Sequence, residues 1–153
     1  MSQDRLFFPD LARQYQKNSS SDFIVLEKLK SIHAKQISEF RLWASKKEWF
    51  QFHENHYDWW TFPINDKSSF GLTYTVFKEE TDLLQTDSDF MTNFREGLRL
   101  VALSWAWKLE TREEIPESQR DLHQQWYALI FLLVGCNWII DMFHFISCNV
   151  ITI

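Results

Sequence analysis

The chain contains few of the residues that make tight turns, with three glycines and three prolines among 153 residues. Sandwiches and barrels of short β-strands depend on many such turns, so this scarcity argues against both architectures. Aromatic residues, by contrast, make up 17% of the chain. Each aromatic side chain can bury roughly 150–250 Å² of surface, which supplies a large apolar core. The composition therefore predicts one compact all-α domain over residues 1–153.

A concentrated basic surface is also missing, because the longest run of basic residues is the pair Lys46–Lys47 and the net charge is −5. Binding to a phosphate backbone needs clustered lysine and arginine, so we expect no nucleic-acid partner. Glycine-rich phosphate loops, G-x-S-x-G turns and kinase signatures are absent as well. These absences favour a protein without a cofactor and without catalytic activity.

Cysteine is scarce too, since Cys136 and Cys148 are the only two in the chain. Both lie in a late apolar segment, which is typical of reduced thiols rather than of a disulfide framework. The first ten residues, MSQDRLFFPD, do not show the basic-then-apolar order of a secretory signal. We therefore expect an intracellular, cytoplasmic protein.

One long apolar segment, Trp126–Ile146, has nearly the length of a membrane span. Asn137, Asp141 and His144 interrupt it, and their spacings of four and three place them on one stripe of a helix. A mid-membrane aspartate costs about 2.5–3.5 kcal/mol, so we favour a core helix with one polar stripe. Two alternatives stay open, namely membrane contact and a homodimer that covers an otherwise exposed apolar helix.

Helical periodicity is strongest between residues 90 and 105, where apolar residues recur at steps of four, four, three and four. Similar spacing predicts a helix that begins near residue 23, after a cap in Asn18–Asp22. Ser45–Glu48 has the form of a capping box for a short following helix, and Thr86–Ser88 caps another. The last helix is expected to begin near Pro116. We predict five or six helices with an irregular aromatic turn near residues 57–71.

Two histidines, His53 and His56, lie three residues apart and would share one face of a helix. Together with Asp58 they offer three ligands for zinc or iron. Asp141 and His144 have the same spacing and would suit a carboxylate-oriented imidazole base arriving from the last helix. A small enzyme or metalloprotein is therefore the alternative hypothesis. No H-E-x-x-H motif or cysteine pair supports it, so we predict no metal.

Adjacent tryptophans, Trp59 and Trp60, follow these histidines. Neighbouring side chains point in different directions, so we expect one indole in the core and the other on the surface. Tryptophan is enriched at binding hot spots, and polar loops beside aromatic anchors often carry binding. The leading hypothesis is a peptide- or protein-binding module. Trp59 would be its apolar anchor, surrounded by His53, His56, Asp58 and Asp66 in the region 53–69.

The stretch ISEFRLWASKKEWFQFHENHYDWWTFPI, Ile37–Ile64, resembles the conserved region of the opioid growth factor receptor family. That family has an I-x-E-F stretch followed at the same distance by H-x-Y-I-Q-W-L-F-P-L. The residues that match are Ile37, Glu39, Phe40, Tyr57, Trp60, Phe62, Pro63 and Ile64. A weaker likeness extends to Glu110. Asp58, Trp59 and Thr61 depart from the signature.

The resemblance implies a helical domain in which the matching aromatic residues form a structural junction. In animals the family is described as a nucleus-associated receptor for an opioid peptide, which implies a nuclear location as an alternative to the cytoplasm. No ligand residues are carried over, because the matching positions are typical of core and turn. Asp58 and Trp59, where this chain differs, are the better candidates for a function of its own.

Overall fold

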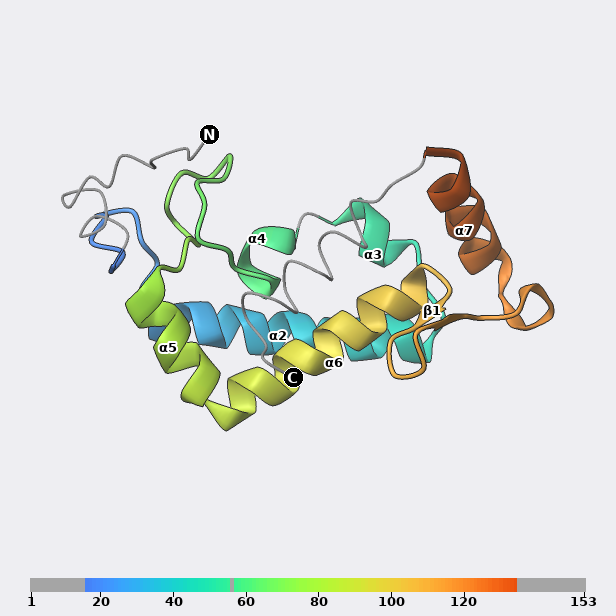
Figure 1. Cartoon of the computed structure of the whole chain (residues 1–153), viewed down its shortest axis with the longest axis horizontal. Helices are drawn as coiled ribbons and strands as arrows, with labels where there is room; N and C mark the ends of the chain where they lie inside the picture. Colours follow the sequence, from blue (N-terminus) through green and yellow to red (C-terminus); the bar gives the residue numbers. More distant parts are fainter. Residues whose placement is uncertain (1–15, 56, 135–153) are drawn as a thin grey trace, which may run out of the picture.

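The computed structural model describes residues 16–55 and 57–134 (Figure 1). Within these residues the chain forms six α-helices, four of them substantial, and one small hairpin. The helices are α2 (Leu26–Ser45), α3 (Gln51–Glu54), α4 (Asp58–Thr61), α5 (Lys78–Thr86), α6 (Ser88–Ser104) and α7 (Leu122–Val134). Strand β1 (Trp107–Lys108) pairs antiparallel with β2 (Glu113–Glu114), and a 3₁₀ turn covers Glu117–Gln119. The predicted all-α class with five or six helices is confirmed.

The centre of the fold is the packing of α2 against α6, which is more extensive than that of any other described pair of elements. Each helix buries an apolar face with helical spacing, and the residues are Leu29, His33, Ile37, Phe40, Phe90, Phe94, Leu98 and Val101. The predicted periodicity of residues 90–105 is therefore correct. The two helices pack closely at Gly97, where a Cβ atom would lie 2.6 Å from Ile37 Cδ1. Only glycine fits this crossing without displacing Ile37.

An aromatic cluster joins α2 to the short helices α3 and α4. The Phe40 ring contacts Phe52 at 4.8 Å and Tyr57 at 4.6 Å between ring centroids. The buried Tyr57 hydroxyl donates a hydrogen bond of 2.7 Å to the carbonyl of Phe52. Phe62 continues the cluster to α6 with an edge-to-face contact of 5.7 Å to Phe94. These residues end α3 and turn the chain into the core.

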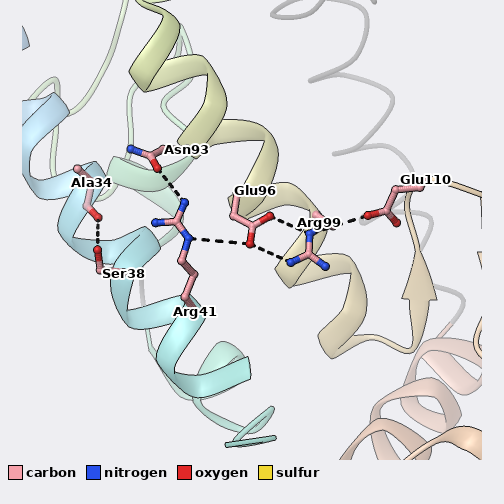
Figure 2. A network of polar contacts seen from close by, with 7 residues as sticks. All are labelled: Ala34, Ser38, Arg41, Asn93, Glu96, Arg99 and Glu110. Carbon is pink, nitrogen blue, oxygen red and sulfur yellow. Dashed lines mark hydrogen bonds and ion pairs between the residues drawn. The ribbon is translucent and has the colours of Figure 1, made fainter. Parts of the chain in front are cut away.

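Figure 2 shows a polar network on the outside of the same helix pair. Arg99 forms two hydrogen bonds of 2.8 Å to Glu96, and this partner lowers the pKa of the Glu96 carboxyl. Arg41 of α2 lies 4.0 Å from the Glu96 carboxylate and donates a hydrogen bond of 3.1 Å to Asn93. Arg99 also lies 3.9 Å from Glu110 in the hairpin. The network therefore ties α2, α6 and the hairpin together.

Two of the predicted helix caps are wrong. Val25 precedes α2 and Phe50 precedes α3, and neither helix has a side-chain cap. Instead of capping α2, the Asn18 side chain donates to the carbonyls of Leu72 and Thr75 at 2.9 and 2.8 Å. The third cap is correct, because Asp87 accepts a 2.9 Å hydrogen bond from the amide of Phe90. Long-range hydrogen bonds override the local capping pattern where the fold offers a partner.

The last helix begins later than predicted. The 3₁₀ turn at Glu117–Gln119 comes first, and α7 begins at Leu122. Residues after Val134, including Asn137, Asp141 and His144, lie outside the described part of the chain. Among the described helices, none combines the length and the apolar character needed to cross a bilayer.

Candidate functional site

The single turn of α4 gives its two tryptophans different surroundings. Trp60 packs against the buried core, and its indole N–H donates 3.1 Å to Gln36 Oε1 on α2. Trp59 is half-buried and is not among the described residues that pack on that core. Both tryptophans are half-buried, so the structure does not show the expected division between one indole in the core and the other on the surface. The role of Trp59 as a binding anchor stays a prediction.

Three aromatic rings lead from α4 to the surface. Trp60 contacts Tyr74 with 5.6 Å between ring centroids, and Tyr74 contacts Phe70 edge-to-face at 5.7 Å. Phe70 has 48% of its surface exposed although it is a large apolar residue. We call Trp60, Tyr74 and Phe70 the aromatic row. In Figure 1, α4 and the loop 62–77 that carries Tyr74 and Phe70 lie on the same side of the α2–α6 pair.

Backbone hydrogen bonds fix the loop that carries the row. Ser68 and Gly71 exchange two hydrogen bonds of 3.0 Å, and Gly71 has φ 64°, which a residue with a side chain adopts only with strain. The Thr75 hydroxyl donates 2.9 Å to the carbonyl of Asp66. The buried Asn18 side chain, which precedes the loop in the sequence, donates hydrogen bonds to the carbonyls of Leu72 and Thr75. Phe70 is thus presented at the tip of a cross-linked turn.

Polar side chains surround Phe70 in this turn. Asp66, Lys67 and Ser69 are exposed. Asp66 keeps its carboxylate close to the turn, because its Oδ1 accepts a 2.7 Å hydrogen bond from the amide of Lys67. Asp58, at the start of α4, is half-buried beside Tyr57, and its charge adds to the burial that raises the pKa of the Tyr57 hydroxyl. Both predicted acidic residues therefore stand on the elements that carry the row.

His53 is placed elsewhere. Its ring stacks on Tyr127 of α7 at 3.6 Å and meets Trp105 edge-on at 4.4 Å. Burial lowers the pKa of His53 to about 4, although a hydrogen bond to the backbone of Ser104 favours the charged form. The imidazole therefore joins α3 to the end of α6 and to α7. It does not reach the aromatic row.

The enzyme or metalloprotein alternative lies only partly within the described residues. They contain no group of three or more His, Cys, Asp or Glu side chains placed to hold a metal ion. His53 is enclosed by aromatic rings. Of the other members proposed for that site, Asp58 lies at the start of α4, whereas His56, Asp141 and His144 lie outside residues 16–55 and 57–134.

Sequence reasoning missed a buried polar pair in the core. His33 of α2 and Thr61 of α4 are both fully buried. Neither His33 ring nitrogen nor Thr61 Oγ1 has a hydrogen-bond partner of normal geometry. The available signal was position, since His33 lies four residues after Leu29 and four before Ile37 on the buried face of α2. Phe70 and Tyr74 were missed because no local pattern predicts their contact with Trp60.

No model of a known protein family matches the chain, and neither a curated protein nor a solved structure does. The likeness of Ile37–Ile64 to the opioid growth factor receptor family stays a prediction.

Proposed function

We propose that the chain is a non-catalytic interaction module that binds a peptide segment of a protein partner along the aromatic row. The observation that carries this proposal is Phe70, an exposed aromatic residue held on a hydrogen-bonded turn and in contact with Tyr74. Aromatic residues dominate binding energies when a partner buries them. A fixed loop loses little conformational entropy on binding, so more of that energy appears as affinity.

Charge on the elements that carry the row suggests the chemistry of the ligand. Asp66 is exposed in the same loop as Phe70, next to the exposed Lys67, Asp58 lies at the start of α4, and the whole chain has a net charge of −5. A segment with one or two large apolar side chains flanked by lysine or arginine would satisfy both features. Trp59 is proposed as a second anchor. The low cysteine content supports a partner met in the cytoplasm.

A random-peptide display library provides a defined test without knowledge of the natural partner. The immobilised full chain is used for selection, and enriched peptides are then measured by calorimetry against Phe70→Ala and Trp59→Ala. Leu83→Ala is the matched control, because Leu83 on α5 is also a large apolar residue with 59% of its surface exposed. Far-UV circular dichroism and thermal unfolding show that each variant is folded.

The proposal predicts peptides that contain apolar and basic residues. It also predicts that Phe70→Ala weakens their binding by about tenfold or more, which is the usual effect of truncating a hot-spot residue. Trp59→Ala should weaken binding in the same direction, whereas Leu83→Ala should leave it unchanged. Equal binding by wild type and Phe70→Ala, or no enrichment over repeated rounds, would refute the proposal.

A further inference from the structure

Val25, immediately before α2, has a backbone conformation that valine normally avoids. Its φ is 65° and its ψ is 148°, close to a region that glycine almost alone occupies. A β-branched residue with positive φ is a genuine outlier, because its side chain crowds the neighbouring peptide groups. The other described non-glycine residues with positive φ are Lys47, Ala106 and Arg112, and none of them is β-branched. Val25 therefore carries strain that the branched side chain itself creates.

The fold requires this backbone conformation but not this side chain. Ile24 and Leu26, on either side of Val25, both pack against the core, and the Ile24 amide donates 3.1 Å to the carbonyl of Thr73. These contacts fix the backbone between them. Glycine would adopt the same conformation without steric cost, and serine, aspartate or asparagine would also cap the helix. Valine offers neither advantage, and α2 has no side-chain cap.

Packing does not explain the valine either. Val25 has 59% of its surface exposed and is not among the described residues that pack on the core. Exposure by itself is common in this chain, because α7 also exposes apolar residues, namely Leu122, Trp126, Leu129 and Ile130. Those four lie within a helix, whereas Val25 combines exposure with strain and with an unused capping position. A residue that lowers stability in several ways is expected at a functional site.

Val25 is also connected to the loop that carries the aromatic row. The carbonyl of Thr73, which accepts the hydrogen bond from Ile24, belongs to this loop. The Thr73 hydroxyl in turn donates 2.8 Å to the carbonyl of Phe70. Two hydrogen bonds thus link the residue next to Val25 with Phe70. In Figure 1 the start of α2 and the loop 62–77 lie at the same end of the molecule.

We propose that Val25 is a further binding residue of the peptide site, where it contacts an apolar side chain of the same peptide that covers Phe70. Its role rests on the proposed function, because it extends that site from the loop 62–77 to the start of α2. A β-branched side chain has few rotamers, and the backbone of Val25 is fixed by its neighbours. Val25 therefore loses little conformational entropy when a peptide covers it, and more of the contact energy appears as affinity.

Calorimetry with a peptide from the display selection tests this role by comparing the wild type with Val25→Ala and Val25→Gly. Both variants lack the branched side chain, so both should weaken binding by about fivefold. In thermal unfolding, Val25→Gly should raise the Tm by about 2–4 °C, because glycine removes the strain. Far-UV circular dichroism shows that each variant is folded.

Lys47→Gly is the matched control for the relief of strain. Lys47 is exposed and has φ 56°, but it lies just beyond the other end of α2. This variant should not lower the Tm, and it should bind the peptide as the wild type does. A loss of affinity equal to that of Val25→Gly would overturn the role of Val25, because the loss would not depend on its side chain.

The other outcomes separate the role of Val25 from the proposed function. Wild-type affinity in Val25→Ala and Val25→Gly, with weaker binding in Phe70→Ala, would overturn the role of Val25 and leave the proposed function standing. Wild-type affinity in all three variants would refute both, as would a selection without enriched peptides. Weaker binding in Val25→Gly alone would assign the loss to backbone flexibility and overturn the role. A lower Tm in Val25→Gly would also overturn it, because valine would then stabilise the fold.

Discussion

Acid should weaken this fold through His33, a fully buried imidazole with no hydrogen-bond partner of normal geometry on either nitrogen. Its ring lies 4.4 Å from that of Phe90 and 6.3 Å from that of Phe94. Burial lowers the pKa of His33 from 6.5 to about 4, and the nearby backbone of Thr61 offsets only part of this effect. Between these two values the unfolded chain binds a proton that the folded chain does not bind. Stability is therefore complete above pH 6.5 and falls as the pH is lowered towards 4.

The size of the effect follows from these two pKa values. Proton linkage gives a loss of about 2.5 kcal/mol at pH 4.5, and of about 3 kcal/mol once His33 is protonated in both states. A domain of this size has a total stability of roughly 5–15 kcal/mol, so one histidine accounts for a sizeable fraction. His53 adds in the same direction, because burial lowers its pKa to about 4 as well.

The assay compares wild type with His33→Leu, which has similar volume and cannot be protonated. Urea unfolding at pH 7.5 and at pH 4.5 gives the free energy of unfolding of each protein. The loss between the two pH values should be smaller in His33→Leu by about 2.5 kcal/mol, since His53 and the carboxyl groups are common to both proteins. An equal loss in both proteins would refute the reasoning, because it would mean that His33 gains a proton as easily in the folded as in the unfolded chain.

Two further variants test the packing and the start of α7. Gly97→Ala should destabilise the fold by about 1–3 kcal/mol through overpacking, because its Cβ would lie 2.6 Å from Ile37 Cδ1. Adding Ile37→Val, which removes that methyl group, should recover part of the loss in urea unfolding, and no recovery would place the clash elsewhere. Asp121→Ala should cost about 1–2 kcal/mol, since it removes the cap of α7 and the acceptor for the Trp49 indole. Glu113→Ala, at an exposed carboxylate, is the control, and an equal loss in that variant would contradict the capping role.

Periodicity predicted the long helices because the pattern that defines them is local. The spacing from Phe90 to Trp105 identifies the buried face of α6, and Asp87 stands where an N-cap is expected. Both features depend on residues within one or two turns of each other. The aromatic composition likewise predicted a large apolar core, and the rings of Phe40 and Phe52 form part of it.

Long-range contacts account for what the sequence did not predict. The side chain of Asn18 closes a loop more than fifty residues away instead of capping α2. His53 does not lie near Trp59 as predicted. Its ring packs between Trp105 and Tyr127, which are more than fifty residues away in the sequence. The contact of Phe70 with the aromatic row depends on how the loop 62–77 folds back on α4. Residue spacing along the chain does not predict contacts between residues so far apart in the sequence.

The orientation of α7 is the clearest case in which long-range contacts outweigh the local sequence pattern. The polar stripe of Asn137, Asp141 and His144 and the cost of a mid-membrane aspartate favoured a core helix for Trp126–Ile146, which implies that its apolar residues are buried. The capping box of Asp121 and Gln124, together with the Gln124–Leu103 hydrogen bond, turns the helix the other way. A few directional hydrogen bonds at a helix start therefore decide which face meets solvent.

The measurement that tests the central claim most directly is an amide and indole chemical-shift map of the full chain, titrated with a peptide from the display selection. Our account predicts that the largest changes occur at the amides of Phe70 and Tyr74 and at the indole N–H of Trp59. Peptide-induced changes confined to α7, or scattered over the surface without the aromatic row, would contradict it.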